Sequence, residues 1–260
     1  MHQIRNGWLK VESKNEKNLA ITACLLAGRL LIENGSNMER VNDTMRRMAQ
    51  SAGLKKFEAF TTMTAIVTCA EHRPNTQVID IHQRKLNLNK VAAVNSLSRQ
   101  FADHKIDLIE LYDGLKKVDH QPQQTSDFIQ CVAAGVLSWA LTIVYTGNVH
   151  DSPFAALIGF LSYLVYLMLG KHSKAKFVNE FCTSLVIAIF AVAFVKLHWA
   201  NDINDIIIGC VMPLVPGVPL TNAARDLMSG DLISGTSRAV EATLTAIAIG
   251  CAIVLVLRYV

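Results

Sequence analysis

The sequence has little of the chemistry that would support a disulfide framework or a metal site. Only six cysteines occur among its 260 residues, and no two of them form a CxxC pair. Four fall in apolar segments, where cysteine behaves as a small hydrophobic residue. The eight histidines are dispersed as well, and their spacing from Cys, Asp and Glu does not make a metal site. We therefore expect no disulfide, no metal ion and no cofactor.

Charge is scarce in the second half of the chain. Residues 1–127 contain 18 Lys+Arg and 14 Asp+Glu, whereas residues 128–260 contain seven of each. The first half thus carries the whole net charge of +4. This is the composition of a soluble domain followed by a membrane domain. We expect a small α+β domain at 1–120, a polar linker at 121–127 and a transmembrane domain at 128–260.

The first residues contain no apolar run of signal-peptide length, so the soluble domain is expected in the cytoplasm. Apolar residues recur with helical spacing over Glu16–Asn34, and Gly35 then suits a left-handed C-terminal cap. Ser36 and Glu39 fit a capping box that opens a second helix, which ends at Gly53. The pattern predicts a helical hairpin.

Three short segments after this hairpin predict strands. FEAFTTM, TAIVTCA and TQVIDI are rich in β-branched and aromatic residues, and Glu71–Asn75, which contains Pro74, predicts a turn before the last of them. Two further helices are expected near residues 86–102 and 106–118. The domain is therefore predicted to combine a small antiparallel or mixed sheet with flanking helices.

Several polar residues of the soluble half are candidates for a functional site. Its basic residues are most simply a solvated helix face and a charged loop, and without interleaved aromatics they do not indicate nucleic-acid binding. Two histidines flank the third predicted strand and face one another if that strand forms. Three threonines are most simply strand residues, although a hydrolytic nucleophile among them stays open as an alternative. These residues are Arg40, Arg46, Arg47, Arg84, Lys85, His72, His82, Thr61, Thr62 and Thr64.

Five apolar runs in the second half are long enough to cross a bilayer core of about 30 Å. The loop GKHSKAKF is basic, whereas GNVHD has no Lys or Arg. By the positive-inside rule the soluble domain lies inside and Val260 outside. The alternative, the buried core of a large soluble protein, does not explain this loop charge pattern. The runs are 128–146, 152–170, 178–195, 206–224 and 237–257.

The fourth run contains residues that interrupt a helix. Pro213, Pro216, Gly217 and Pro219 fall within seven residues, and each proline removes a backbone donor and clashes with the preceding turn. The backbone groups freed by such a break must face protein or a wet cavity. Secondary transporters use broken helices of this kind to build sites near the membrane midplane. The sequence therefore predicts a broken span that lines a pathway.

Polar residues follow the break at helical spacing. Asn222 and Asp226 should share a face, and Arg225 should reach it through its i,i+3 relation to Asn222. Arg225 could hold a substrate carboxylate, and Asp226 or Glu241 could take a proton or an ammonium group. The alternative is that Arg225 and Asp226 anchor the inner end of the span by pairing with headgroups or with each other. The predicted pathway comprises Pro213, Pro216, Gly217, Pro219, Thr221, Asn222, Arg225, Asp226, Asp231 and Glu241.

Two segments resemble the threonine/serine exporter family of bacterial inner-membrane proteins. LVPGVPLTNAARDLMSGDLISGTSRAVEA, at Leu214–Ala242, is similar to the family's Pro-Gly-x-Pro pattern with its following Asn, Asp and Gly-Asp. AGRLLIENGSNMERVNDTM, at Ala27–Met45, resembles its N-terminal helical hairpin. The chain has Ser36-Asn37 where a small residue and Ala-Glu are often seen. The resemblance covers nearly the whole chain.

The resemblance implies export of small polar metabolites, such as threonine, serine or dicarboxylates like succinate. It also implies that the chain is half of a transporter in the cytoplasmic membrane, completed by a separate small membrane subunit of about five spans. We therefore expect a non-enzymatic secondary exporter subunit in a hetero- or homo-oligomer, driven by the proton gradient and in contact with lipid. Two alternatives remain: a regulatory or scaffolding subunit whose partner carries the pathway, and a membrane-tethered hydrolase.

Overall fold

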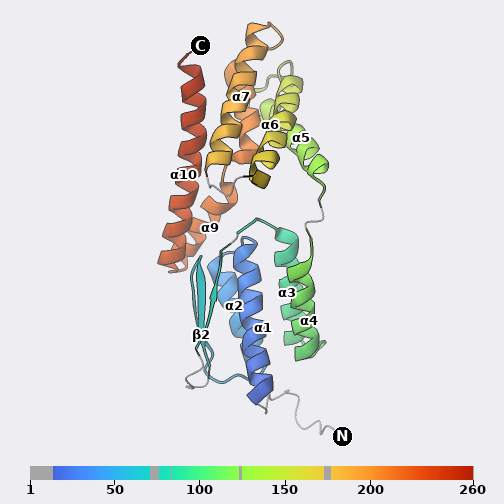
Figure 1. The fold of residues 1–260 in the computed structure, drawn as a ribbon, viewed down its shortest axis with the longest axis vertical. Helices are drawn as coiled ribbons and strands as arrows, with labels where there is room; N and C mark the ends of the chain where they lie inside the picture. The colour runs from blue at the N-terminus through green and yellow to red at the C-terminus, as the bar shows by residue number, and fades with distance from the viewer. Residues whose placement is uncertain (1–13, 71–75, 83, 123–124, 173–176, 260) are drawn as a thin grey trace. The chain divides into compact units, whose positions relative to one another are not determined.

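The computed structural model describes residues 14–70, 76–82, 84–122, 125–172 and 177–259 (Figure 1). The chain forms two compact units. The first combines Met1–Pro122 with Val218–Ala239, and the second combines Gln123–Gly217 with Val240–Val260. The first unit is thus built from two pieces of chain that are distant in sequence.

The first unit packs helices against a small sheet. Its hydrophobic core takes buried side chains from residues 20–118, of which Leu30, Met45, Ile66, Val94 and Leu115 are at most 1% exposed. The N-terminal piece contributes four helices to this unit, and the later piece adds one helix and the start of another. These are α1 (Lys14–Glu33), α2 (Met38–Ser51), α3 (Leu88–Ala102), α4 (Leu108–His120), α9 (Gly217–Met228) and the first turns of α10 (Leu232–Leu257).

The three predicted strands form an antiparallel sheet in the order β1-β2-β3. The strands are β1 (Glu58–Thr61), β2 (Ala65–Cys69) and β3 (Gln77–Asp80). Burial alternates along β2, because one face of the sheet packs on the helices and the other faces solvent. The predicted turn at Glu71–Asn75 lies outside the described residues.

The turn between α1 and α2 differs from the prediction in one respect. Gly35 is left-handed, with φ +90°, as the cap prediction required. The predicted capping box of Ser36 and Glu39 is wrong, because α2 begins one residue later than that box requires. Asn37 is the N-cap, and its side-chain oxygen accepts the Arg40 N–H at 3.0 Å. Asn caps a helix as well as Ser does, and Ser36 stays in the turn, where its N–H donates to the carbonyl oxygen of Leu31.

The second unit is a bundle of long apolar helices. It contains α5 (Asp127–Thr146), α6 (Ser152–His172), α7 (Val178–Lys196), α8 (Ile203–Val211), the 3₁₀ turn η1 (Met212–Leu214) and the remainder of α10. Among the described residues, four helices are long and apolar enough to cross a membrane. The bent pair Ile203–Leu214 and Gly217–Met228 makes a fifth candidate. The last predicted span begins at Leu232 rather than Ser237.

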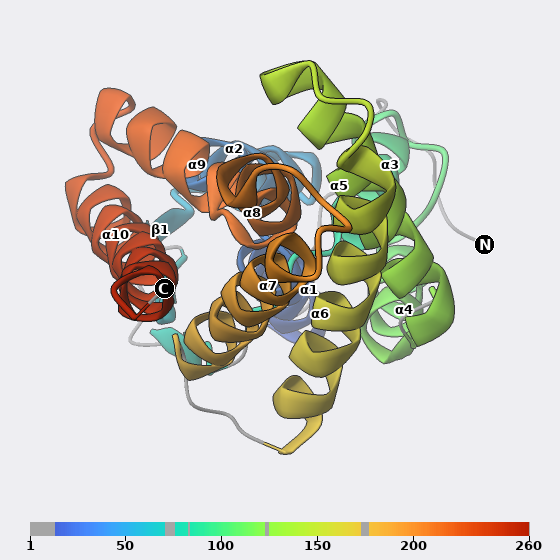
Figure 2. The same cartoon turned by 90° about the horizontal axis from the view of Figure 1, so that it is seen from above.

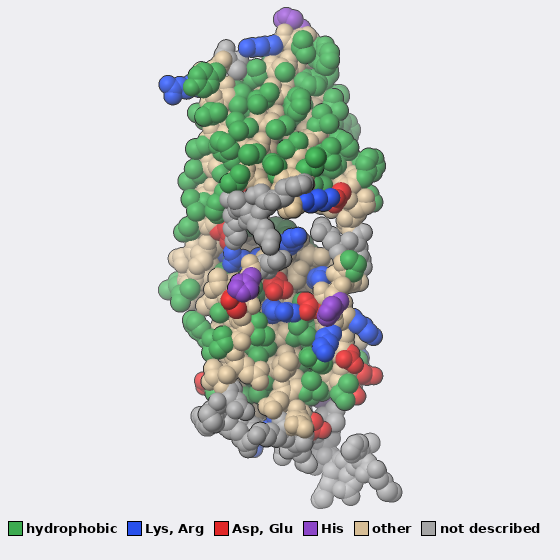
Figure 3. Space-filling model, viewed as in Figure 1, with side chains coloured by type: hydrophobic (Ala, Val, Ile, Leu, Met, Phe, Trp, Pro, Cys, Tyr) green, Lys and Arg blue, Asp and Glu red, His purple; other side chains and the backbone are tan. Residues whose placement is uncertain are grey.

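The surface of this bundle is apolar where a soluble protein would be polar. Trp139, Val144 and Ile189 are each about half exposed or more, and hydrophobic side chains cover most of the bundle's visible face, with Lys and Arg gathered at its ends (Figure 3). Large exposed apolar surfaces of this kind are lipid-facing or bind partners. The chain is therefore a membrane protein.

Small residues let the helices of the bundle approach closely. A Cβ added at Gly159 would lie 2.2 Å from Ser138 Oγ, and one added at Gly209 would lie 1.9 Å from Thr142 Oγ1. These contacts join α5 to α6 and α8, and α5 and α6 run side by side in both ribbon views (Figure 2). Membrane helices pack in this way because close backbone approach replaces the missing hydrophobic drive.

The predicted helix break is present at Val215. Pro213 lies in η1, and Val215 is extended, with φ −63° and ψ 129°. A residue before proline avoids the helical region, so Pro216 accounts for the conformation of Val215. Pro219 lies in the first turn of α9, where the backbone N–H groups have no partner within the helix and proline is tolerated. The prolines therefore end one helix and start the next.

Candidate functional site

Asp226 is the most buried of the predicted pathway residues, with no exposed surface. Its Oδ1 accepts the backbone N–H of Met38 at 2.8 Å, and its Oδ2 lies 3.0 Å from Arg238 Nε. Met38 is the first residue of α2, so this N–H is unsatisfied within its own helix and lies at the positive end of the helix dipole. The carboxylate of Asp226 is thus held by a helix N-terminus and a guanidinium.

Two neighbouring contacts hold the same turn. Asn222 Nδ2 donates to the carbonyl oxygen of Gly35 at 2.9 Å, and Arg238 Nη2 donates to that of Ser36 at 2.6 Å. All of these residues belong to the first unit. We call the contacts of Asn222, Asp226 and Arg238 with Gly35, Ser36 and Met38 the latch, since they tie the α9–α10 turn to the α1–α2 turn.

The other predicted pathway residues lie outside the latch. Thr221 and Arg225 are exposed, and Glu241 is half-buried. Asp231 is partly buried beside Glu39, and burial followed by that neighbouring carboxylate raises the pKa of Asp231. At the break, Pro216 is buried and Pro213 half-buried, while Gly217 and Pro219 are exposed. The structure therefore brings Asn222 and Asp226 together on one face of α9, with Arg238 as the cation that contacts Asp226.

Arg238 was not among the predicted site residues. The signal for it was present, since an arginine at the start of an apolar helix needs an anionic or carbonyl partner. Its partner carbonyl at Ser36 lies about 200 positions earlier in the chain, and no local spacing rule connects the two.

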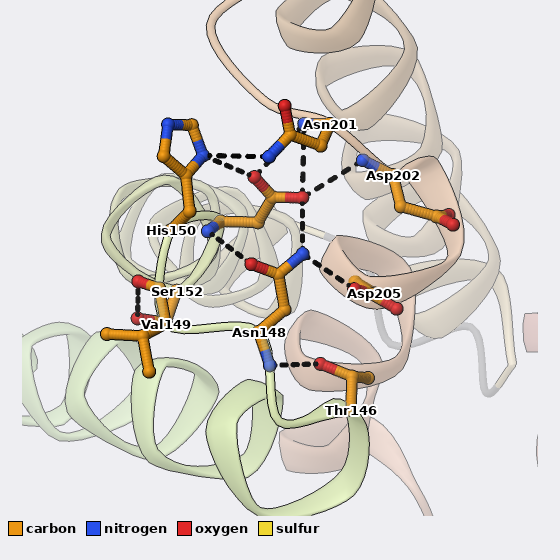
Figure 4. Close-up of polar contacts among 9 residues, drawn as sticks. Thr146, Asn148, Val149, His150, Ser152, Asn201, Asp202 and Asp205 are labelled. Carbon is orange, nitrogen blue, oxygen red and sulfur yellow. Dashed lines mark hydrogen bonds and ion pairs between the residues drawn. The ribbon is translucent and has the colours of Figure 1, made fainter.

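A second polar cluster joins two connections of the bundle. The Asp151 side chain is fully buried, and it accepts the backbone N–H groups of Asn201 at 3.0 Å and Asp202 at 2.9 Å. It also accepts a hydrogen bond from Asn148 Nδ2 at 2.9 Å, and its Oδ1 lies 2.9 Å from His150 Nδ1 (Figure 4). Asn148 in turn donates to Asp205 at 2.8 Å. The cluster therefore closes one end of the bundle by joining the α5–α6 and α7–α8 connections.

The hydrogen bonds of this cluster control the charge of Asp151. Burial raises the pKa of Asp151, but the hydrogen bonds from His150, Asp202 and Asn201 outweigh it and leave the pKa below its usual value. Asp151 is therefore ionised at neutral pH. From the sequence this segment was predicted only to be an outside loop without Lys or Arg, although an acid directly before an apolar helix was a usable signal.

The candidates in the soluble half do not converge on one point. Arg47 forms an exposed pair with Asp43, and His82 forms one with Asp80. His72 lies outside the described residues. Thr61 donates to Asn42 Oδ1, and the Thr62 hydroxyl bonds within its own turn. Within the described part of the chain, no group of three or more His, Cys, Asp or Glu is arranged to hold a metal ion.

Residues 22–260 match the family described as "Putative threonine/serine exporter". The chain belongs to this family. A protein of Escherichia coli K12 named "Probable succinate transporter subunit YjjP" is 21% identical over 250 residues, covering 94% of this chain and 96% of that protein. A Klebsiella aerogenes protein of the same name is 21% identical over 239 residues, covering 90% and 92%. No solved structure matches the chain. The exporter family and the apolar helices together support a subunit of a membrane exporter.

Proposed function

We propose that the chain is one subunit of a secondary exporter in the bacterial cytoplasmic membrane. It would export small polar metabolites, either amino acids of the threonine/serine type or small carboxylates, at the expense of the proton gradient. The family match supports export, and the names of the two relatives support both a carboxylate substrate and a second subunit. We expect that second subunit to be a separate membrane protein of about five spans.

The interrupted helix followed by a latched carboxylate is the observation that carries this proposal. The break at Val215 separates η1 from α9, and broken helices in transporters offer backbone groups to substrates and ions. Eleven residues later along the chain, Asp226 is covered on all sides. A substrate carboxylate has the same chemistry as Asp226, and it would compete for Arg238 and for the N-terminus of α2. We therefore assign the latch as the part that opens during transport.

The exposed residues of α9 suit the first contact with substrate. Arg225 and Thr221 have the side chains to meet a carboxylate and a hydroxyl or ammonium group. Pro213, Pro216, Gly217 and Pro219 would hold the break open. Asp231 and Glu241 complete the proposed pathway.

A regulatory role is the second candidate, because the latch binds the N-terminal turn directly. A ligand sensed by the N-terminal domain would then act by releasing α9, while the partner carried the substrate. In both cases we place the N-terminal domain in the cytoplasm and Val260 outside.

Efflux measurements on cells that express each subunit alone or both together test the proposal. Cells are preloaded with labelled threonine or succinate, and efflux is followed with and without a proton gradient. We expect efflux only from cells with both subunits, and at least a tenfold loss with Asp226→Ala or Asn222→Ala at equal protein level in the membrane. Arg47→Ala, in an exposed pair far along the chain from the latch, serves as the matched control and should retain full efflux. Efflux by the partner alone would remove this chain from the pathway and favour the regulatory role.

A further inference from the structure

Four oxygen atoms on the first turns of α7 are buried and have no hydrogen-bond partner among the described residues. They are Asn179 Oδ1, Glu180 Oε2, Thr183 Oγ1 and Ser184 Oγ. Thr183 and Ser184 are fully buried. Buried polar atoms in folded proteins are almost always hydrogen-bonded, so four neighbouring exceptions require an explanation.

The hydroxyl groups elsewhere in the apolar helices behave differently. Thr142, Ser162 and Thr245 each donate to a carbonyl oxygen of the preceding turn of their own helix. This is the usual way to satisfy Ser and Thr in a membrane helix. The buried hydroxyl of Ser138 lies instead in the tight contact with Gly159. Thr183 and Ser184 have neither arrangement, so their hydroxyls remain available to a ligand.

These four groups share one face of α7. Glu180 is three residues from Thr183 and four from Ser184, and Asn179 is four from Thr183, so their side chains are neighbours on the helix surface. Side chains on a helix lean toward its N-terminus, which directs the two hydroxyls back toward Asn179 and Glu180. The stripe continues into the fully buried Ile187, which packs in the bundle core. The four polar side chains therefore lie on the face of α7 that packs inside the bundle, not on the face that is exposed to lipid.

The neighbouring helices bring no described cation to this face. On α6, Tyr166 interacts with Glu180 and Tyr163 stacks beside Tyr166, while the Gly170 position lies next to the Asn179 amide. Lys171 of α6 pairs with Asp127. On the other elements of the core, α8 carries Asp205 and Cys210, with Asp205 held by Asn148. α10 carries Glu241, Cys251 and Arg238, and Arg238 contacts Asp226 and the carbonyl oxygen of Ser36. Cys182 lies on α7 itself.

We propose that Glu180 is the proton-binding residue that couples export to the proton gradient, an inference that rests on the proposed function. Among the described residues Glu180 has no cationic partner, and its buried Oε2 accepts no hydrogen bond. Hydroxyl groups donate to a carboxylate and accept from a carboxylic acid. Tyr166 hydrogen-bonds Glu180, and the unpartnered hydroxyls of Thr183 and Ser184 lie beside it on the same face of α7. Asn179 offers both an amide donor and an acceptor oxygen.

Transport driven by a pH gradient tests this assignment. The full chain and its partner are reconstituted in vesicles, and labelled succinate and threonine are followed in two modes: accumulation driven by a pH gradient, and exchange at equal pH. With Glu180→Gln we expect the ratio of gradient-driven accumulation to exchange to fall at least tenfold. Glu180→Asp, which keeps a titratable carboxyl, should recover part of that ratio. Thr183→Val should shift the pH midpoint of accumulation upward, because the hydroxyl stabilises the carboxylate more than the acid.

A chemical readout that needs no transport keeps the two proposals separate. Dicyclohexylcarbodiimide adds to protonated carboxyl groups in apolar surroundings and leaves a stable N-acylurea, which mass spectrometry locates. We expect labelling of Glu180 that declines as pH rises, measured from pH 4 to 8. Labelled Glu180 without transport of either solute would refute the exporter and leave the proton site standing. An unchanged ratio in Glu180→Gln, accumulation driven by Na⁺ in place of H⁺, or no label at Glu180 across this pH range would overturn the proton site.

Discussion

The latch and the polar face of α7 each contain a carboxylate in an apolar setting, and the chain treats the two in opposite ways. Asp226 pairs with Arg238 and accepts a hydrogen bond from the first N–H of α2. Glu180 hydrogen-bonds the Tyr166 hydroxyl, and its Oε2 has no hydrogen-bond partner among the described residues. Asp151 resembles Asp226, with backbone donors in place of the guanidinium. A carboxylate with an ion pair and a backbone donor can fix two segments together, whereas Glu180 has neither among the described residues.

Removing Arg238 should have the largest effect on stability. Arg238→Ala leaves Asp226 buried without its cation, and breaking one partner of a buried pair costs about 3–5 kcal/mol in the free energy of unfolding. Chemical denaturation of the full chain in detergent measures this loss. The double variant Asp226→Ala/Arg238→Ala should lose about 0.5–3 kcal/mol less than the sum of the single variants, because each residue needs the other. Arg225→Ala, exposed on the same segment, should change stability by no more than about 0.5 kcal/mol; an equal loss there would show that the latch is not the cause.

Asp151→Asn should lose about 2–3 kcal/mol, since hydrogen bonds to a charged acceptor contribute about 1.5–3 kcal/mol and the amide brings hydrogens toward N–H donors. The folded-state pKa of Asp151 is depressed, so its contribution is present above the ordinary carboxyl pKa of about 3.9 and is lost as pH falls through the lower folded value. The stability gap between the wild type and Asp151→Asn should therefore be constant near neutral pH and close in acid. Asp43→Asn, in an exposed pair, should show a loss below about 1 kcal/mol. A gap that widened in acid would contradict the assigned direction of the shift.

The N-terminus of α2 is held by two kinds of contact: the side chain of Asn37 next to it in sequence, and Asp226 from a distant segment. Asn37→Ala removes the acceptor for the Arg40 N–H and should cost about 1 kcal/mol, while leaving the contact between Asp226 and Met38 in place. Asn37→Asp keeps a side-chain oxygen and should be close to the wild type. Thermal unfolding of these variants and of Arg238→Ala would show whether the Asn37 cap or the latch contributes more to stability. A loss in Asn37→Ala as large as that in Arg238→Ala would contradict the expected order.

Glu180→Gln should have the smallest effect. The substitution removes no described ion pair, and the amide can keep the hydrogen bond with Tyr166. It also replaces a group whose charged form is costly to bury. We expect the free energy of unfolding to stay the same or to rise by about 1 kcal/mol or less, in the same detergent assay. A loss comparable to that of Arg238→Ala would mean that Glu180 has a structural partner and would remove the contrast with Asp226.

Much of the fold followed from local pattern. Apolar run length located the long helices, alternation located the three strands, and the prolines located the break at Val215, because each rule acts within a few residues. The capping box at Ser36 failed for the opposite reason, since Asn37 offered an equally good cap one residue away. The spacing rules placed Asn222 and Asp226 on one face of α9. They could not supply Arg238, Met38 or the α1–α2 turn as partners, since those contacts depend on packing between distant segments.

The discontinuity of the first unit has a consequence for how the chain is made. Residues 14–122 leave the ribosome well before Val218–Ala239, and synthesis of the intervening 123–217 segment takes on the order of ten seconds. Throughout that interval the N–H of Met38 and the carbonyl of Ser36 lack the partners that they have in the finished chain. The N-terminal domain therefore emerges early but is completed only after the apolar helices have been synthesised. A chain cut short before Arg238 would leave that turn open, in a form that quality-control proteases can distinguish from the complete subunit.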